Sequence, residues 1–243
     1  MSGRRPEADR AFLTARPFAH RGLHGPGLSE NGMAAFDAAI AAGFGIECDV
    51  RLSRDGEAII YHDETLTRLL GSAGRVADLT AAELDAMPLP DGAAPPRFAA
   101  LLARCGRATP LLVEIKVDGW RVTPLCKAIA ADLGRNGDAP AAVMSFNPLA
   151  VRWFARHAPK VTRGLVVTQQ GKGNWRGRLS RALALWLARP DFLACDIRDL
   201  PSPFACAFRR RGLPVLTWTV RNAQDRRTAA DHADQIIFEH GHD

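Results

Sequence analysis

The sequence predicts a (β/α)8 barrel, a TIM barrel, that carries one small insertion, and this prediction rests on three observations. Short β-like runs alternate with longer runs of helical periodicity over the 243 residues, which is typical of a parallel sheet covered by helices. About eight such units fit this length better as a closed barrel than as an open doubly wound sheet. Residues 63–97 break the alternation, because they are rich in glycine, proline and aspartate.

The expected elements follow in order along the chain. The β-like runs are residues 16–21, 44–52, 57–62, 110–117, 141–146, 161–167, 192–197, 214–220 and 235–238. The helical runs are residues 33–43, 97–105, 121–134, 148–158, 176–189, 202–212 and 223–233, and several of them end in glycine, a common stop signal. We expect one domain over residues 1–243, in which residues 63–97 form an insertion after the third β-like run, too short to hold a core of its own.

Bulk composition narrows the classes of function. Hydrophobic residues make up 47% of the chain and charged residues 24%, as in ordinary globular proteins. The net charge is +6, but no basic run is interleaved with aromatic residues, so we expect no nucleic-acid partner. Five cysteines without a C-x-x-C pair argue against a disulfide scaffold or a zinc site. Since no signal-peptide or membrane-span pattern is found, we expect a cytoplasmic protein.

Acidic residues share one face of two predicted strands. Since side chains alternate along a strand, Glu47 and Asp49 point the same way, and so do Glu114 and Lys116. At the carboxyl ends of barrel strands these residues would meet in one mouth. Three buried carboxylates repel one another unless they take up protons or a cation, and oxygen ligands favour Mg2+ or Ca2+. Structural ion pairs within each strand are the alternative, which weakens when both strands are considered together.

Two histidines end predicted strands beside this acidic cluster. A single histidine at a strand end is more often structural than catalytic, but with both His20 and His62 present, one can take a proton while the other gives one. Arg21 and Lys116 are candidates to bind a phosphate, which needs positive charge and fixed donors. Asp63 either orients the imidazole of His62 or caps the next turn, and we favour the cap.

Together these motifs resemble those of the glycerophosphodiester phosphodiesterases. The fragments are AHRG, SEN before a helix, IECDV, IIYHDETLTRLLGSAGRVADLTAAEL and LLVEIK, followed later by MSFNPLAVRWF, LTWTV and ADQIIF. Their order and spacing match across roughly the first half of the chain. HRG alone would be a weak signal, but the combination is specific.

The resemblance implies a TIM barrel with a small insertion after the HD motif, and hydrolysis of a small-molecule glycerophosphodiester to glycerol 3-phosphate and an alcohol. It implies a divalent metal cation, Mg2+ or Ca2+, and an attack by water or by the 2-hydroxyl of the substrate. The matching positions are Glu47, Asp49 and Glu114 for the metal, His20 and His62 for acid–base catalysis, and Arg21 and Lys116 for the phosphate.

Four positions are less settled by the resemblance. Glu30 matches a motif position near the metal, or it supports the first helix locally. Gly32 stands where the family usually has threonine. Glu239, in the ending IIFEHG, is expected to stand in for the aspartate of a common family ending. Trp218 matches a position that lines the pocket, and its alternative is a core tryptophan between barrel and helices.

Parts of the sequence are also compatible with three rival functions. A lysophospholipase D at a membrane surface would use the basic amphipathic stretch 175–190, but we expect that stretch to bury its apolar stripe as a barrel helix, so membrane contact is not favoured. The residues of that stripe are Leu179, Leu183, Trp186 and Leu187. A non-catalytic barrel that binds phosphorylated metabolites has no need of both the metal and the histidine sets. A metal-dependent aldolase would offer Lys116, but two histidines suit phosphodiester cleavage better.

Overall fold

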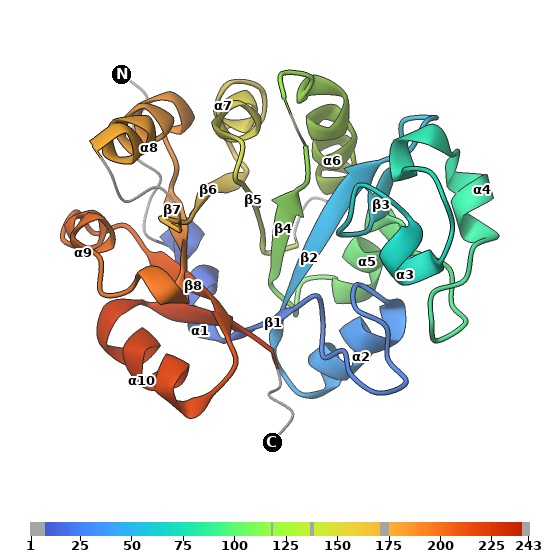
Figure 1. The fold of residues 1–243 in the computed structure, drawn as a ribbon, viewed down its shortest axis with the longest axis horizontal. Helices are drawn as coiled ribbons and strands as arrows, with labels where there is room; N and C mark the ends of the chain where they lie inside the picture. Colours follow the sequence, from blue (N-terminus) through green and yellow to red (C-terminus); the bar gives the residue numbers. More distant parts are fainter. Residues whose placement is uncertain (1–7, 118, 137–138, 171–174, 240–243) are drawn as a thin grey trace.

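Eight parallel strands close into a barrel in the computed structural model, which describes residues 8–117, 119–136, 139–170 and 175–239 (Figure 1). The strands are β1 (Phe18–His20), β2 (Gly45–Leu52), β4 (Leu111–Ile115), β5 (Ala141–Ser145), β6 (Thr162–Val167), β7 (Phe192–Asp196), β8 (Val215–Val220) and β9 (Gln235–Phe238). The barrel is closed because β1 pairs in parallel with β2 on one side and with β9 on the other. The predicted TIM barrel is confirmed, and each of these strands falls within a predicted run.

Helices surround the barrel on its outside, and their ends lie within three residues of those of the predicted runs. They are α2 (Met33–Ala41), α5 (Phe98–Cys105), α6 (Thr123–Arg135), α7 (Pro148–His157), α8 (Trp175–Ala188), α9 (Pro203–Arg209) and α10 (Ala223–His232). Side chains of Asn147, Ser202 and Asn222 accept a backbone N–H at the starts of α7, α9 and α10, which satisfies donors that a helix start leaves open. A short helix not expected from the sequence, α1 (Phe12–Ala15), precedes β1.

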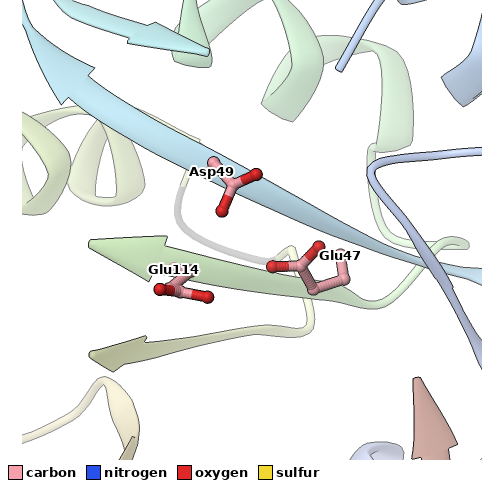
Figure 2. A group of neighbouring side chains, drawn as sticks. All are labelled: Glu47, Asp49 and Glu114. Atoms are coloured by element: carbon pink, nitrogen blue, oxygen red, sulfur yellow. The ribbon is translucent and has the colours of Figure 1, made fainter. Parts of the chain in front are cut away.

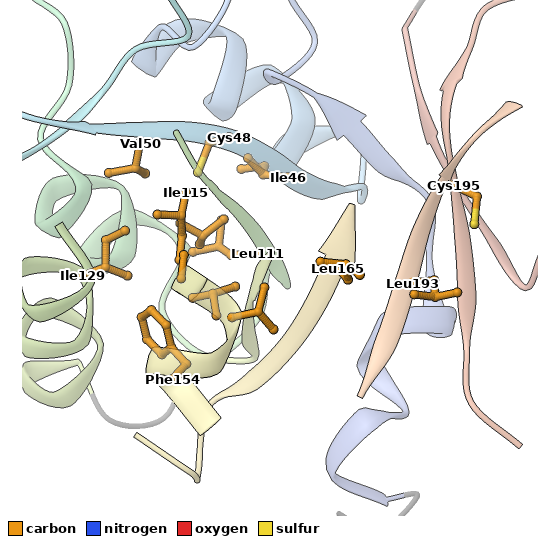
Figure 3. Close-up of a cluster of buried hydrophobic side chains, with 14 of the residues drawn as sticks. Ile46, Cys48, Val50, Leu111, Ile115, Ile129, Phe154, Leu165, Leu193 and Cys195 are labelled. Carbon is orange, nitrogen blue, oxygen red and sulfur yellow. The ribbon is translucent and has the colours of Figure 1, made fainter. Parts of the chain in front are cut away.

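Side chains of the barrel strands divide into two buried layers. The inner layer fills the barrel and consists of Leu13, Phe18, Leu112, Ala142, Met144, Val166, Phe192, Ala194, Leu216 and Ile237. The outer layer lies between the strands and the helices and includes Ile46, Cys48, Val50 and Ile115 (Figure 3). Because residues alternate along β2, Glu47 and Asp49 point to the inner side, where Glu47 lies opposite Leu112.

The third predicted run differs in direction from the barrel strands. Strand β3 (Ala58–Ile60) runs antiparallel to β2, with Val50 opposite Ile60, so it lies outside the parallel barrel. The chain turns after β2 and returns, and the backbone N–H of Tyr61 donates to the carbonyl of Asp49. This hairpin brings His62 back to the level of the acidic residues, although His62 does not end a barrel strand.

The insertion contains α3 (Thr67–Leu70), a 3-10 turn at Val76–Asp78 and α4 (Ala81–Asp85). Its buried apolar residues form a small cluster with two residues at β3: Ile59, Tyr61, Leu66, Val76, Ala81, Leu84 and Leu89. Thr80 and Glu83 form a reciprocal capping box at the start of α4. The insertion is therefore ordered by packing onto the hairpin that carries His62.

One prediction about the outer helices is wrong. The apolar stripe of α8 was expected to be buried, but Leu179, Leu183 and Trp186 are exposed. Ala184 and Leu185 pack against the outer buried layer instead, and Ala188 belongs to it. The helix is apolar on two sides, and the side with the smaller residues faces the barrel. Among the described residues, no helix combines the length and apolar character that a bilayer span requires.

Candidate active site

Three carboxylates meet inside the mouth, the end of the barrel at which the parallel strands finish (Figure 2). Glu47 and Asp49 come from β2 and Glu114 from β4, and one carboxylate oxygen of each lies within 4.8 Å of the others. All three are buried. Asp49 lies directly opposite Glu114 in the parallel register of β2 and β4, so strand pairing itself brings the charges together.

Two cations partly compensate this charge. The Nζ atom of Lys116 lies 2.6 Å from Oε1 of Glu114 and 3.1 Å from Oδ1 of Asp49. The Nε atom of Arg21 lies 3.2 Å from Oδ2 of Asp49, and its backbone N–H donates to Oε2 of Glu47. The other oxygen of Glu47, Oε1, is buried without a hydrogen-bond partner among the described residues.

The uneven distribution of these cations shifts the carboxylates in opposite directions. Burial, reinforced by the charges of Asp49 and Glu114, raises the pKa of Glu47 well above its usual value. Burial also raises the pKa of Glu114, although Lys116 opposes the shift. For Asp49, the ammonium of Lys116 and the guanidinium of Arg21 outweigh the effect of burial and lower the pKa. Lys116 and Arg21 also lower the pKa of Glu47, but by less than burial and the two neighbouring carboxylates raise it.

The three carboxylates fit a hard divalent cation. Buried oxygen donors from three side chains are the ligands that Mg2+ and Ca2+ prefer. The Oε1 atom of Glu47 has no hydrogen-bond partner among the described residues, and the pKa of Glu47 is raised. Both observations indicate a site that lacks positive charge, which such an ion would supply. These residues, which sequence analysis selected, are therefore suited to hold a metal ion.

The imidazole of His20 forms a hydrogen bond with a carboxylate that directly follows the last strand, β9. Its Nδ1 atom lies 2.6 Å from Oε1 of Glu239, and Nε of Arg221 donates to the other oxygen of Glu239 at 2.7 Å. Burial alone would raise the pKa of Glu239, but the hydrogen bonds from His20 and Arg221 lower it to about 2. An ionised carboxylate accepts the Nδ1 proton, which leaves Nε2 of His20 as the nitrogen available to a substrate.

His62 is held in the same manner by its neighbour. Oδ1 of Asp63 lies 2.7 Å from Nδ1 of His62, and Nε of Arg68 donates to Oδ2 of Asp63 at 2.5 Å. The preference for Asp63 as a turn cap is therefore wrong, because both its oxygens are engaged by side chains. Burial lowers the pKa of His62, against the opposing charge of Asp49.

Glu30 lies between two arginines rather than among the carboxylates of the cluster. Its Oε1 atom accepts from Arg21 at 2.9 Å and from Arg68 at 2.6 Å. Burial raises the pKa of Glu30, but the hydrogen bond from Arg68 and the charge of Arg21 outweigh it and lower the pKa. Both carboxylate oxygens of Glu30 accept hydrogen bonds from these arginines, so Glu30 links the surroundings of the two histidines.

The backbone after β1 has a conformation that explains its glycine. Gly22 has a φ of +79°, and a Cβ atom there would lie 2.8 Å from the backbone carbon of Ala35 in α2. Glycine is thus required both for the left-handed conformation and for the close approach to α2. The neighbouring Arg21 also has a positive φ, of 57°, which aims its side chain at the acidic cluster.

Sequence reasoning missed three residues that hold the site together. Asn31 donates from Nδ2 to Oδ2 of Asp49 at 2.9 Å, and its Oδ1 accepts the backbone N–H of Asp49. Arg68 and Arg221 hold the carboxylates behind the two histidines. Asn31 lies within the SEN fragment and Arg68 within IIYHDETLTRLLGSAGRVADLTAAEL, but the resemblance assigned neither residue a role.

A cavity of about 530 Å3 opens at the mouth. Its charged lining residues include His20, Arg21, Glu47, His62, Glu114 and Lys116. Trp218 also lines it, packs against the inner layer of the barrel, and donates from Nε1 to the carbonyl of Ala194. Its ring meets that of Phe146 edge to face at 5.6 Å. Arg198, Arg221 and Asp225 are polar lining residues, so the cavity offers charged and aromatic sides to a ligand.

The structure brings the eleven candidate residues to this one mouth. Seven of them line the cavity, while Asp49, Glu30, Asp63 and Glu239 contact lining residues from behind. His24, to which sequence analysis assigned no role, is half-buried, and burial lowers its pKa.

Comparison with known sequences identifies one family. The sequence model of the glycerophosphoryl diester phosphodiesterase family matches residues 20–239. A Mycobacterium tuberculosis protein named as a glycerophosphodiester phosphodiesterase is 44% identical over 75 residues, which are 30% of this chain and 27% of that protein. YhdW of Bacillus subtilis, which carries a name of the same kind, is 28% identical over 222 residues, 87% of each protein.

Solved structures agree with this result. A Silicibacter pomeroyi protein named as a glycerophosphoryl diester phosphodiesterase has a TM-score of 0.84 at 25% identity, covering 97% of this chain and 95% of its own. A phosphodiesterase of Oleispira antarctica, in complex with the product sn-glycerol-3-phosphate, has a TM-score of 0.79 at 20% identity, with 93% of each chain covered. At 20% identity, the similarity to the Oleispira antarctica protein is one of fold alone.

Proposed function

Because the chain belongs to the glycerophosphoryl diester phosphodiesterase family, we propose that it hydrolyses a glycerophosphodiester to glycerol 3-phosphate and an alcohol. The observation that carries the proposal is the pairing of His20 and His62 around one cluster of carboxylates, each histidine with a carboxylate at Nδ1. The glycerol 3-phosphate in the related Oleispira antarctica structure supports the substrate class.

A divalent cation, Mg2+ or Ca2+, is held in this proposal by Glu47, Asp49 and Glu114. When bound, it supplies positive charge that stabilises the charge developing on the phosphoryl oxygens. The Oε1 atom of Glu47 supports this assignment, because it is buried and has no hydrogen-bond partner among the described residues.

Arg21 and Lys116 supply the further positive charge that a phosphodiester needs. Both line the cavity, and each is held in place by carboxylates behind or beside it, Glu30 and Asp49 for Arg21 and Glu114 for Lys116. Donors that are already fixed before the substrate arrives do not need to reorganise as charge develops in the transition state.

The two histidines divide the proton transfers. With Nδ1 bonded to an ionised carboxylate, each imidazole presents Nε2 to the cavity. One Nε2 takes the proton of the attacking oxygen, and the other, carrying a proton, gives it to the leaving alcohol as the P–O bond breaks. The attacking oxygen belongs to water or to the 2-hydroxyl of the substrate, and in the second case a cyclic phosphate is opened by water in a later step.

The direct test is hydrolysis of glycerophosphocholine with Mg2+ or Ca2+ and after chelation, with the wild type and with His20→Ala and His62→Ala. General acid–base groups contribute about 100-fold to 10,000-fold, so each variant should lose activity on that scale. His157→Ala is the matched control, because His157 is exposed on α7. Wild-type, metal-dependent rates in both site variants would exclude the acid–base assignment. Trapping of a cyclic phosphate decides which oxygen attacks.

A further inference from the structure

Helix α8 turns an apolar face away from the barrel. Leu179, Leu183 and Trp186 are three or four positions apart, which places them on one side of the helix. They are 63%, 60% and 66% exposed. Large apolar side chains grouped on a surface mark a site of contact with another molecule or a membrane.

The fold does not need this face. The opposite side of α8 already packs on the barrel, through Ala184, Leu185 and Ala188. A helix of a barrel needs one apolar stripe against the sheet, so a second apolar side indicates a contact outside the barrel.

This face belongs to the most basic part of the chain. Residues 139–190 contain nine of the 32 lysines and arginines and none of the 26 aspartates and glutamates. Helices α7 and α8 lie side by side within this segment (Figure 1). Arg156 and Lys160, at and after the end of α7, and Arg189, after α8, are exposed. The apolar face is therefore accompanied by positive charge without acidic residues from the same segment.

We propose that the face formed by Leu179, Leu183 and Trp186 docks onto an anionic phospholipid bilayer. The three side chains insert shallowly at the boundary between head groups and acyl chains, and the basic residues of the flank attract the anionic head groups. A nucleic acid would use the charge but not the apolar face. Self-association would bury the apolar face but bring two basic flanks together, whereas an anionic lipid surface uses both features.

Docking in this way bears on the orientation of the barrel. Strand β6 ends at the mouth and α8 follows it in the chain, so α8 begins on the mouth side of the barrel. Arg156, Lys160 and Arg189 lie where α7 and α8 finish, toward the opposite end, so a bilayer bound along α8 lies against the side of the barrel. This inference does not depend on the proposed hydrolysis, since binding is measured without turnover.

The test is co-sedimentation with vesicles of phosphatidylcholine alone and of phosphatidylcholine mixed with phosphatidylglycerol. The wild type should bind the anionic vesicles, and binding should weaken as salt screens the head groups. The double variant Leu183→Ser/Trp186→Ser should lose at least about tenfold in partitioning, because it removes two apolar side chains from the interface. Its circular dichroism and thermal transition should match the wild type, because both side chains are exposed.

Trp120→Ser is the matched control, since Trp120 is 88% exposed and lies between β4 and α6, so its variant should bind as the wild type does. Equal losses in the control and the α8 variant overturn the assignment to α8. An absence of wild-type binding to anionic vesicles at low salt overturns the proposal outright. The proposal is also overturned if the protein binds single-stranded DNA, or forms a dimer in light scattering, and does not bind the vesicles.

Discussion

The Nδ1 atom of His20 lies 2.6 Å from Oε1 of Glu239, although the two residues are 219 positions apart in the chain. The contact forms because β9 pairs with β1 and thereby closes the barrel. Arg221, which follows the neighbouring strand β8, holds the other oxygen of Glu239. The surroundings of His20 therefore depend on closure of the whole barrel and not on a single loop.

Glu239→Gln tests whether this carboxylate sets the state of His20. A neutral amide does not stabilise a charged imidazole, and its side chain can present a donor to Nδ1, which favours the wrong tautomer. We expect kcat for glycerophosphocholine to fall at least about tenfold with a smaller change in KM. Glu239→Asp should recover part of the rate. Equal kcat values for wild type and Glu239→Gln would show that Glu239 has no influence on His20.

The same variant has a pH-dependent effect on stability. Burial opposes ionisation of Glu239, but His20 and Arg221 lower its pKa from 4.5 to about 2 in the folded protein. A lowered folded-state pKa contributes stability above pH 4.5 that is lost as pH falls toward 2. Because Glu239 is only half-buried, we expect Glu239→Gln to cost about 1 kcal/mol at pH 7 after allowance for solvent screening. Denaturant unfolding at a series of pH values should show this difference shrinking below pH 4.5. A difference that is constant or grows in acid contradicts the linkage.

The strands and the helices around the barrel were predictable because local pattern and tertiary role agree there. Residues such as Ile46 and Cys48 alternate with Glu47 and Asp49, and that period of two marks both the strand and the direction of each side chain. The acidic cluster followed from the same alternation on two strands. No more than the order of elements in the chain was needed to place it at the mouth.

The remaining features depend on three-dimensional pairing that a linear pattern does not contain. Strand β3 resembles the barrel strands in composition, and its antiparallel direction follows from the turn after β2. In the sequence, nothing distinguishes Arg68 from the other arginines, because its contacts with Glu30 and Asp63 form only in the folded protein. Helix α8 has two apolar sides, and hydrophobicity alone does not show which of them packs on the barrel. The prediction buried the side of Leu179, Leu183 and Trp186, which is exposed in the structure.

Gly22→Ala tests the role of the tight backbone after His20 and Arg21. A Cβ atom at Gly22 would meet the backbone of Ala35 at 2.8 Å, in addition to the strain of a positive φ. We expect a loss of about 2 kcal/mol or more in the free energy of unfolding, together with reduced activity. Gly27→Ala is the matched control, because Gly27 has the same φ of +79° but nothing within 4 Å of a Cβ atom. If both variants lose the same stability, the clash with α2 contributes nothing.

Glu47→Gln separates the cost of the acidic cluster from its use. Burial and the charges of Asp49 and Glu114 raise the pKa of Glu47 in the metal-free protein. Ionising Glu47 therefore lowers the stability of the folded protein once the pH exceeds the usual pKa of a glutamate. A neutral glutamine removes this repulsion, and we expect the metal-free variant to be more stable than the wild type at pH 7.5, by about 1 kcal/mol. The wild type should gain about 2.7 kcal/mol at Mg2+ or Ca2+ concentrations one hundred times Kd, whereas the variant should gain little. Calorimetry with chelator and with each metal measures both effects, and Glu64→Gln, at an exposed glutamate of the insertion, is the control. If metal stabilises Glu47→Gln as much as the wild type, Glu47 is not a ligand.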